Sequence, residues 1–193
     1  MRHERADKMS EMMITRRGLM LGAGAFGLTA CNNGIGSNGA SQIEARVSAT
    51  QEFLFNQYPG TRDLAARAAG VLYMPLMTEA GLGFGGAFGR GALRIQGVTV
   101  DYYSAAKGSF GLQIGAQQYA HALFFMTSEA LEKFRRSSGW AVGGDIRYAS
   151  PEEGASIGKE STELEEVIAL VFGQQGLIAG ATLSGIKYTR IIP

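Results

Sequence analysis

The sequence has very little cysteine and histidine. Cys31 is the one cysteine among 193 residues, and the two histidines are His3 and His121. A lone cysteine near the N-terminus leaves the main part of the chain without a disulfide, a thiol nucleophile or a cysteine-based metal site. No cluster of His, Asp and Glu suggests a metal site either. We therefore expect neither a metal nor a cofactor.

The chain also lacks an excess of basic or acidic residues. The chain carries 18 basic and 17 acidic residues, and loss of residues 1–30 would remove five basic and three acidic ones, which leaves the remainder near neutral. Nucleic-acid binding depends on basic residues that neutralise phosphates. The composition therefore argues against a nucleic-acid partner, although a neutral chain can still carry local basic patches.

Glycine is abundant, with 28 residues in a chain that is 46% hydrophobic. Many glycines interrupt alternating apolar segments, which predicts bent or closely packed strands. Gly81, Gly83 and Gly86 match the G-x-G-x-x-G pattern, but a strand pattern follows them where a dinucleotide site requires a helix. We therefore interpret this tract as a bent strand.

The N-terminus has the features of an export signal. A basic region with Arg16 and Arg17 precedes a short apolar run, which ends in Leu28-Thr-Ala-Cys31. This order resembles a bacterial lipoprotein signal peptide over residues 1–30, with Cys31 as the acylated (palmitate-bearing) first mature residue and residues 31–40 as a flexible tether. Asn32 favours the periplasmic face of the outer membrane by the same resemblance. General secretion and twin-arginine export both stay open.

One alternating stretch, residues 109–117, predicts the central strand of the fold. Its apolar positions are 110, 112, 114 and 116, and its glycine or glutamine positions are 111, 113, 115 and 117. Alternation continues through Tyr119, His121, Leu123 and Phe125, which predicts a long strand or a tight hairpin.

The other elements are predicted around this strand. Helices are expected at residues 41–56, 62–69 and 128–136, the last with Thr127 as its N-cap. Strands are expected at residues 71–74, 92–96, 98–103, 141–149, 167–172 and 177–191, with a hairpin turn at Gln96-Gly97. The predicted fold is one α+β domain, residues 41–193, with a few helices flanking a strongly bent antiparallel sheet that is open or curled into a partial barrel.

Several sequence blocks occur in an order that resembles the SYLF domain family over residues 45–191. They are Ala69-Gly-Val-Leu, Ala80-Gly-Leu-Gly-Phe-Gly-Gly, Tyr102-Tyr-Ser, Ser109-Phe-Gly-Leu-Gln-Ile-Gly-Ala-Gln, Ser138-Gly-Trp, Val171-Phe-Gly and Gly176-Leu-Ile-Ala-Gly. The resemblance implies a phospholipid-binding module, and bacterial members of the family are often envelope lipoproteins. We therefore expect a lipid-anchored, non-enzymatic protein that binds anionic phospholipid. The candidate phosphate contacts are Arg62 and Arg67, with Arg90, Arg94 and Lys107 adding to one basic rim.

Two other functions are compatible with the sequence. The first is a structural envelope protein that binds another protein or itself through the sheet surface of Gln113 and Gln117. The second is a serine hydrolase that uses Ser104 or Ser109. His121 is the one histidine after the leader, and it lies within an apolar alternating strand, so the set of nucleophile, base and orienting group is not complete.

Overall fold

The computed structural model describes residues 38–141, 146–149, 166–176 and 183–193, all of which fall within one compact unit of the chain, Gly34–Pro193. The helices are α2 (Gly39–Gln57), α3 (Gly60–Arg67) and α4 (Ser128–Arg136). The strands are β1 (Gly70–Ile95), β2 (Val98–Phe125), β3 (Trp140–Ala141), β4 (Ile146–Ala149), β5 (Val167–Gly176) and β6 (Lys187–Ile191).

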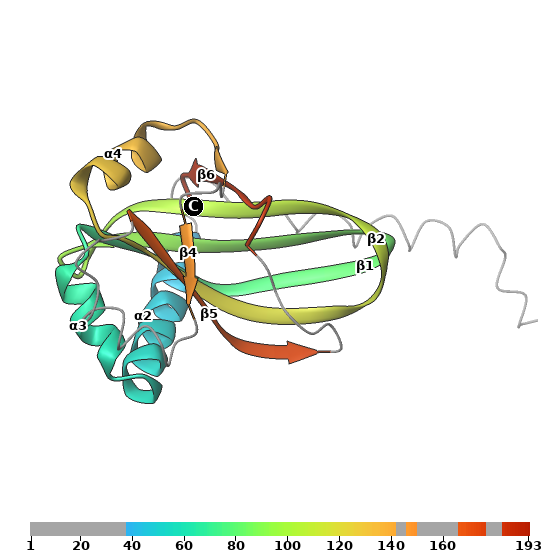
Figure 1. The fold of residues 1–193 in the computed structure, drawn as a ribbon, viewed down its shortest axis with the longest axis horizontal. Helices are drawn as coiled ribbons and strands as arrows, with labels where there is room; N and C mark the ends of the chain where they lie inside the picture. Colours follow the sequence, from blue (N-terminus) through green and yellow to red (C-terminus); the bar gives the residue numbers. More distant parts are fainter. Residues whose placement is uncertain (1–37, 142–145, 150–165, 177–182) are drawn as a thin grey trace, which may run out of the picture. The chain divides into compact units, whose positions relative to one another are not determined.

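A single long hairpin of β1 and β2 dominates the sheet (Figure 1). The two strands pair antiparallel from Gly70 opposite Phe125 to Ile95 opposite Val98. Their turn lies at Gln96 and Gly97, where φ is 50° and 80°, as the sequence predicted. The strands expected at residues 71–74, 92–96, 98–103 and 109–117 are segments of these two strands. The strand expected at residues 71–74 is longer than predicted, because a register shift between Met74 and Met77 lets β1 continue past Pro75.

The hairpin doubles back on itself, so that the first and last parts of β1 lie side by side (Figure 1). A Cβ atom on Gly91 would lie 2.0 Å from the carbonyl oxygen of Tyr73, and one on Gly89 would lie 2.5 Å from that of Leu76. Only glycine allows the backbone to approach this closely. The glycine-rich tract therefore forms a closely packed bend, as the composition indicated.

The predicted α+β fold with a strongly bent antiparallel sheet is confirmed. β2 is the central strand: it pairs with β1 on one side, and on the other side with β6 through residues 102–106 and with β5 through residues 117–125. β3 pairs with β6 at one edge, and β4 pairs with β5 at the other. The β4–β5 pair is parallel, which is the exception among the described strand pairs.

Two hydrophobic cores cover the two faces of the curled sheet. The inner core packs α4 against the sheet and includes Leu72, Leu93, Tyr103, Leu123, Phe125, Phe134 and Tyr188. Tyr188 on β6 reaches His121 on the far half of β2, which places this core inside the curl. The outer core packs α2 and α3 against the sheet and includes Ile43, Val47, Leu54, Leu64, Tyr73, Phe124 and Leu170.

Helix α4 matches its prediction to the residue. The Thr127 hydroxyl accepts a hydrogen bond from the amide of Ala130 at 3.1 Å and caps the helix. Ala130, Leu131 and Phe134 form its buried face, at the spacing of an amphipathic helix. Helices α2 and α3 begin two residues before the predicted starts, and α3 ends at Arg67, two residues before the predicted end.

Three predictions for the C-terminal part need correction. The strand expected at residues 141–149 is two short strands, β3 and β4, in different places of the sheet. The strand expected at 167–172 extends to Gly176, and Gly173 within it has a positive φ of 63°. The last strand starts at Lys187, since a turn with Gly185 at φ 77° precedes it. Residues 150–165 and 177–182 lie outside the described residues.

At the C-terminal end of the stretch 109–117, the buried and exposed faces are the reverse of those predicted. Gln117, expected on the polar face, is buried at 3% exposure, and Ala116, expected on the apolar face, is exposed. The Gln117 side-chain amide donates a hydrogen bond to Glu79 Oε2 at 2.9 Å. A buried amide and carboxylate can satisfy each other in this way, so polarity alone did not predict exposure.

Candidate binding face at α3 and the hairpin turn

Two of the five predicted basic residues, Arg62 and Arg94, line the same pocket. This pocket, here called the turn pocket, has a volume of about 260 Å³ and lies between α2, α3 and the β1–β2 turn. Its lining also includes Gln51, Phe55, Ala65, Ala66, Ala68, Gly70, Val71, Tyr73, Gln96 and Gly97. The pocket therefore combines largely apolar walls with two guanidinium groups.

Arg62 is exposed on α3, at the start of the helix. Its guanidinium carbon lies 4.9 Å from the centre of the Phe55 ring, which orients the side chain over an aromatic face. The helix is held in place by Leu64, which is fully buried, and by Thr61, whose hydroxyl donates to the Tyr58 carbonyl oxygen at 2.7 Å. A firmly seated helix thus presents Arg62 to solvent.

Arg94 joins α2 to the hairpin. Its Nη2 donates to Glu44 Oε2 at 2.9 Å and to Ser48 Oγ at 2.8 Å, and its Nη1 donates to Gln51 Oε1. Burial by itself would raise the pKa of Glu44, but hydrogen bonds from Arg94, Thr99 and Tyr102 lower it below its ordinary value. The Arg94 side chain is 12% exposed, so most of its donors are occupied by these hydrogen bonds, which we call the Arg94 clasp.

Arg67 shares α3 with Arg62. Its side chain is exposed, and Nε donates to the Asp63 carbonyl oxygen at 3.2 Å. Basic side chains in the last turn of a helix interact favourably with the helix dipole. Arg62 and Arg67 therefore place two basic side chains on one short, exposed helix.

Arg90 and Lys107 do not complete a single basic rim. Arg90 lies opposite Ser104 in the hairpin, whereas Lys107 lies opposite Ala87. Ser104 and Lys107 are three positions apart on β2, so strand alternation directs Arg90 and Lys107 to opposite faces. Arg90 lies 5.8 Å from the exposed ring of Phe88, and Lys107 is partly buried. Sequence spacing could not predict that Arg90 and Lys107 lie on opposite faces, because this depends on the register between β1 and β2.

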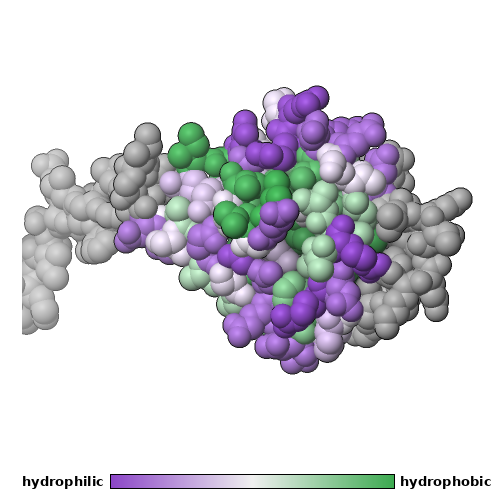
Figure 2. All heavy atoms as spheres, turned by 90° about the vertical axis from the view of Figure 1, so that its left-hand side faces the viewer, coloured by the Kyte–Doolittle hydropathy of each residue, from purple (hydrophilic) through white to green (hydrophobic). Residues whose placement is uncertain are grey.

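Exposed valines lie next to the turn pocket. Val98 is 66% exposed and Val100 is 40% exposed, and both follow directly after the Gln96–Gly97 turn that lines the pocket. Figure 2 looks at the side of the molecule that carries α3 and shows hydrophobic side chains gathered near its centre, bordered by hydrophilic ones. We call the surface of Arg62, Arg67, Val98 and Val100 the α3–turn face. The sequence predicted a strand at residues 98–103, but not its proximity to α3.

The other predicted site residues have simple positions. Cys31 lies outside the described residues, as does the Gln113 side chain. Gln117 is buried, so it does not offer a surface to a partner strand. His121 is fully buried in the inner core beside Tyr119, while Ser104 alternates away from the buried Tyr103 and Ala105 to the other face. The structure does not bring Ser104 and His121 together.

Two further features are absent from residues 38–141, 146–149, 166–176 and 183–193. In these ranges, no group of three or more His, Cys, Asp and Glu side chains could hold a metal ion. None of the helices described combines the length and the apolarity that a membrane-spanning helix needs.

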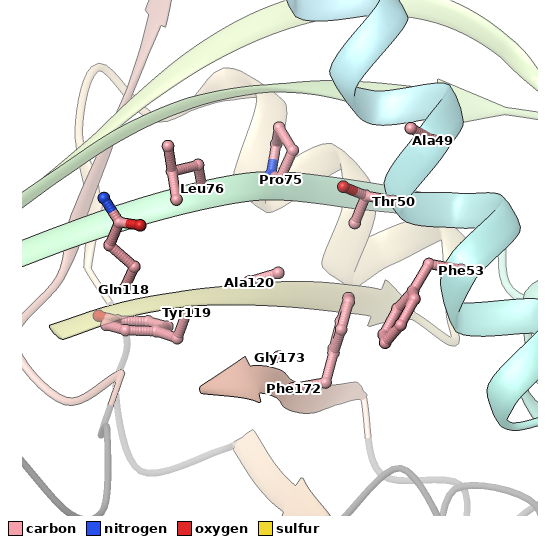
Figure 3. A pocket seen from close by; sticks show the side chains of 10 residues that line it. All are labelled: Ala49, Thr50, Phe53, Pro75, Leu76, Gln118, Tyr119, Ala120, Phe172 and Gly173. Carbon is pink, nitrogen blue, oxygen red and sulfur yellow. The ribbon is translucent and has the colours of Figure 1, made fainter. Parts of the chain in front are cut away.

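Sequence reasoning missed a second hollow, on the opposite flank of α2 (Figure 3). This cleft, here called the α2 groove, has a volume of about 320 Å³ and lies between α2 and strands β1, β2 and β5. The rings of Phe53 and Phe172 stack at its edge, with centroids 6.3 Å apart. Phe53 is 46% exposed. The signal in the sequence was an aromatic residue on α2 away from its buried stripe.

Part of the chain matches a known family model. Residues 106–190, from within β2 to within β6, match the model of the Ysc84 family, described as "Las17-binding protein actin regulator". No curated protein matches the chain closely enough to supply a named relative. Helices α2 and α3 and strand β1 precede the matched residues. This match is consistent with lipid or protein binding. Residues 106–190, less than half of the chain, thus match the Ysc84 (SYLF) family model, as the sequence blocks in this part of the chain indicated.

Proposed function

We propose that this chain is a lipid-anchored protein of a bacterial envelope whose SYLF domain binds anionic phospholipid and catalyses no reaction. The observation that carries the proposal is the α3–turn face. Arg62 and Arg67 stand on α3, and Val98 and Val100 stand on the adjacent strand with 66% and 40% of their surface exposed. Basic groups beside exposed apolar groups suit a surface of anionic head groups above acyl chains.

The expected affinity is modest. A basic residue near an anionic membrane surface contributes about 1 kcal/mol, and apolar surface removed from water contributes about 25 cal/mol per Å². Two arginines and two valines therefore give weak, salt-sensitive binding. An acyl group on Cys31 would keep the domain close to the membrane and raise its effective concentration there, so weak binding would suffice.

In this proposal, the N-terminal leader, residues 1–30, determines how the protein is anchored and where it is located. The apolar run ends at Cys31, and Asn32 follows it, which supports acylation and the periplasmic face of the outer membrane. Mass spectrometry of the protein extracted from membranes tests this part, because acylation adds the mass of the lipid to an N-terminal peptide that starts at Cys31. A mature protein that starts at another residue would contradict it.

Membrane binding is tested by co-sedimentation of residues 32–193 with vesicles. The described members of both cores come from residue 43 onward, so this segment carries both cores. We expect binding to vesicles that contain anionic phospholipid, little binding to zwitterionic vesicles, and weaker binding at high salt. Arg62→Ala with Arg67→Ala should lower the affinity about tenfold or more, given about 1 kcal/mol for each charge.

A matched control removes the same charge elsewhere. Lys133 and Arg136 are exposed on α4, which packs on the inner side of the sheet. Lys133→Ala with Arg136→Ala should leave vesicle binding nearly unchanged. Binding that ignores salt, or that falls equally in both double variants, would contradict the α3–turn face as the site.

A protein partner is the second candidate function, because the matched family model is described by a protein it binds. In this case the apolar part of the same face would contact an envelope protein or a second copy of the chain. Cross-linking in cells through a photoreactive residue at position 98 distinguishes the two. A discrete protein adduct would favour this second candidate, and adducts with lipid alone would exclude it.

A further inference from the structure

The α2 groove lies where two strand irregularities coincide. The β1–β2 register shifts between Met74 and Met77, and the β2–β5 register shifts between Gln118 and Ala120. Both shifts face the same short part of β2, and Gly173 on β5 has φ 63° beside it. Irregular strands leave space that regular pleats would fill, so the hollow beneath α2 is built into the backbone.

The walls of the groove are mainly apolar. Figure 3 shows Phe53 of α2 and Phe172 of β5 facing each other at one end, with Pro75 and Leu76 of β1 along the side. Ala120 forms part of the floor. Thr50 and Gln118 contribute polar side chains to the lining. An apolar hollow with few polar groups favours a hydrocarbon over a polar ligand.

One cation stands on the same flank of α2. Arg46 precedes Ala49, Thr50 and Phe53 by three, four and seven positions, which places it on the helix face that borders the groove. Its side chain is exposed and forms no ion pair with a described residue. Glu44 lies on the opposite face of the helix, and Glu52 lies six positions after Arg46, about 9 Å further along the helix axis, near Phe53. The charge at the Arg46 end of the groove is therefore positive.

The dimensions favour a single hydrocarbon chain as the occupant. A volume of about 320 Å³ is at the lower end of small-ligand pockets, and an α-helix with its side chains has a diameter of about 10 Å or more, too wide for this space. A peptide strand would need a free sheet edge, whereas the groove lies over β2, which pairs with β1 on one side and with β5 on the other. Neither a helix nor a strand of a partner protein therefore suits the groove.

We propose that the α2 groove binds one acyl chain of an anionic amphiphile, with the chain against Phe53, Phe172 and Pro75 and the anionic head group at Arg46. The inference extends the proposed phospholipid binding, because it adds a site for an individual lipid on the flank of α2 opposite the turn pocket. The source of the chain is either a membrane phospholipid or a free fatty acid, which share this chemistry.

The test uses a monomeric ligand so that membrane adsorption cannot contribute. Dodecanoate below its micellar concentration is titrated into residues 32–193 and followed by calorimetry, with dodecyltrimethylammonium as the ligand of opposite charge. We expect saturable binding of one dodecanoate and a clear preference for it over the cation. Arg46→Ala should reduce dodecanoate affinity about fivefold, since one basic contact is lost, and remove most of the preference. The absence of saturable dodecanoate binding would overturn the proposal.

Two matched tryptophan variants locate the site. Ala49 and Ala66 are both exposed helix residues; Ala49 lines the α2 groove and Ala66 lines the turn pocket. Ala49→Trp should abolish dodecanoate binding with little change in the melting temperature, and Ala66→Trp should leave binding intact. Equal loss in both variants, or loss in Ala66→Trp alone, would overturn the assignment to the α2 groove.

Vesicle and monomer assays separate the two proposals. If Ala49→Trp still binds anionic vesicles but not dodecanoate, both proposals stand. If the unmodified domain binds dodecanoate but not vesicles, the groove stands and the membrane proposal fails. If it binds vesicles but not dodecanoate, only the groove fails. Short-chain phosphatidic acid in place of dodecanoate then tells a phospholipid from a free fatty acid by its relative affinity.

Discussion

The Tyr188 hydroxyl lies 2.7 Å from Nε2 of His121, across the interior of the curled sheet. Both side chains are buried, at 1% and 0% exposure. Nδ1 of His121 has no hydrogen-bond partner among the described residues. Burial lowers the pKa of His121 to about 3, so the imidazole is neutral at physiological pH.

The neutral His121 makes stability depend on pH. The unfolded chain binds a proton at its ordinary pKa of 6.5, whereas the folded protein binds it only near 3, so stability is complete above pH 6.5 and falls as the pH falls toward 3. We expect the free energy of unfolding to drop by about 2 kcal/mol between pH 6.5 and about pH 5, at about 1.4 kcal/mol per pH unit. Urea unfolding followed by Trp140 fluorescence measures it.

His121→Leu provides the control for this prediction. With no titrating imidazole, the variant should unfold at nearly the same urea concentration at pH 6.5 and at pH 5, whatever its absolute stability. An equally steep pH dependence in the variant would show that other groups titrate in this window.

Gly91→Ala should be strongly destabilising. The new Cβ would lie 2.0 Å from the Tyr73 carbonyl oxygen, which is backbone and cannot move aside without opening the bend of β1. We expect a loss of about 3 kcal/mol or more in thermal or urea unfolding. Gly108→Ala is the matched control, because a Cβ there meets nothing within 4 Å and its φ is not in the left-handed region. Similar losses in both variants would mean that strand glycines act through flexibility and not through close approach.

Arg94→Gln should lower stability by about 2 kcal/mol, because the guanidinium makes charge-assisted hydrogen bonds to Glu44 and further bonds to α2. A double-mutant cycle with Glu44→Gln should give a coupling of about 1 kcal/mol. Arg136→Gln removes the exposed Arg136–Glu132 pair, whose side chains are 81% and 61% exposed, and should change stability by about 0.5 kcal/mol or less. No coupling between Arg94 and Glu44 would leave Arg94 free for a role in binding.

Thr127→Ala should cost about 1 kcal/mol, the usual loss for an N-cap whose side chain accepts an amide hydrogen bond. Ser128→Ala, at the exposed next position, should be neutral or slightly stabilising, since alanine is the better helix former. Chemical denaturation of the two variants measures the difference. A reversed order would show that Thr127 does not cap α4 in solution.

Some features of the protein were determined by the sequence alone. Helix α4 follows from the spacing of Ala130, Leu131 and Phe134 and from its cap, and the Gln96–Gly97 turn follows from residues that accept positive φ. The strongly bent antiparallel sheet follows from alternation interrupted by glycine. These features depend on backbone dihedral angles and on hydrogen bonds between near neighbours, which residue types set locally.

Other features were decided only by the tertiary structure. The Glu79–Gln117 pair buries two polar residues 38 positions apart, and the Arg94 clasp joins groups up to 50 positions apart. The doubling of the hairpin brings Gly91 to Tyr73, and register shifts open the α2 groove. The regular register between β1 and β2 places Arg90 and Lys107 on opposite faces. Residue types do not fix these relationships, because register and bend position are set by the packing of both cores together, and a one-residue slip exchanges the faces of a strand.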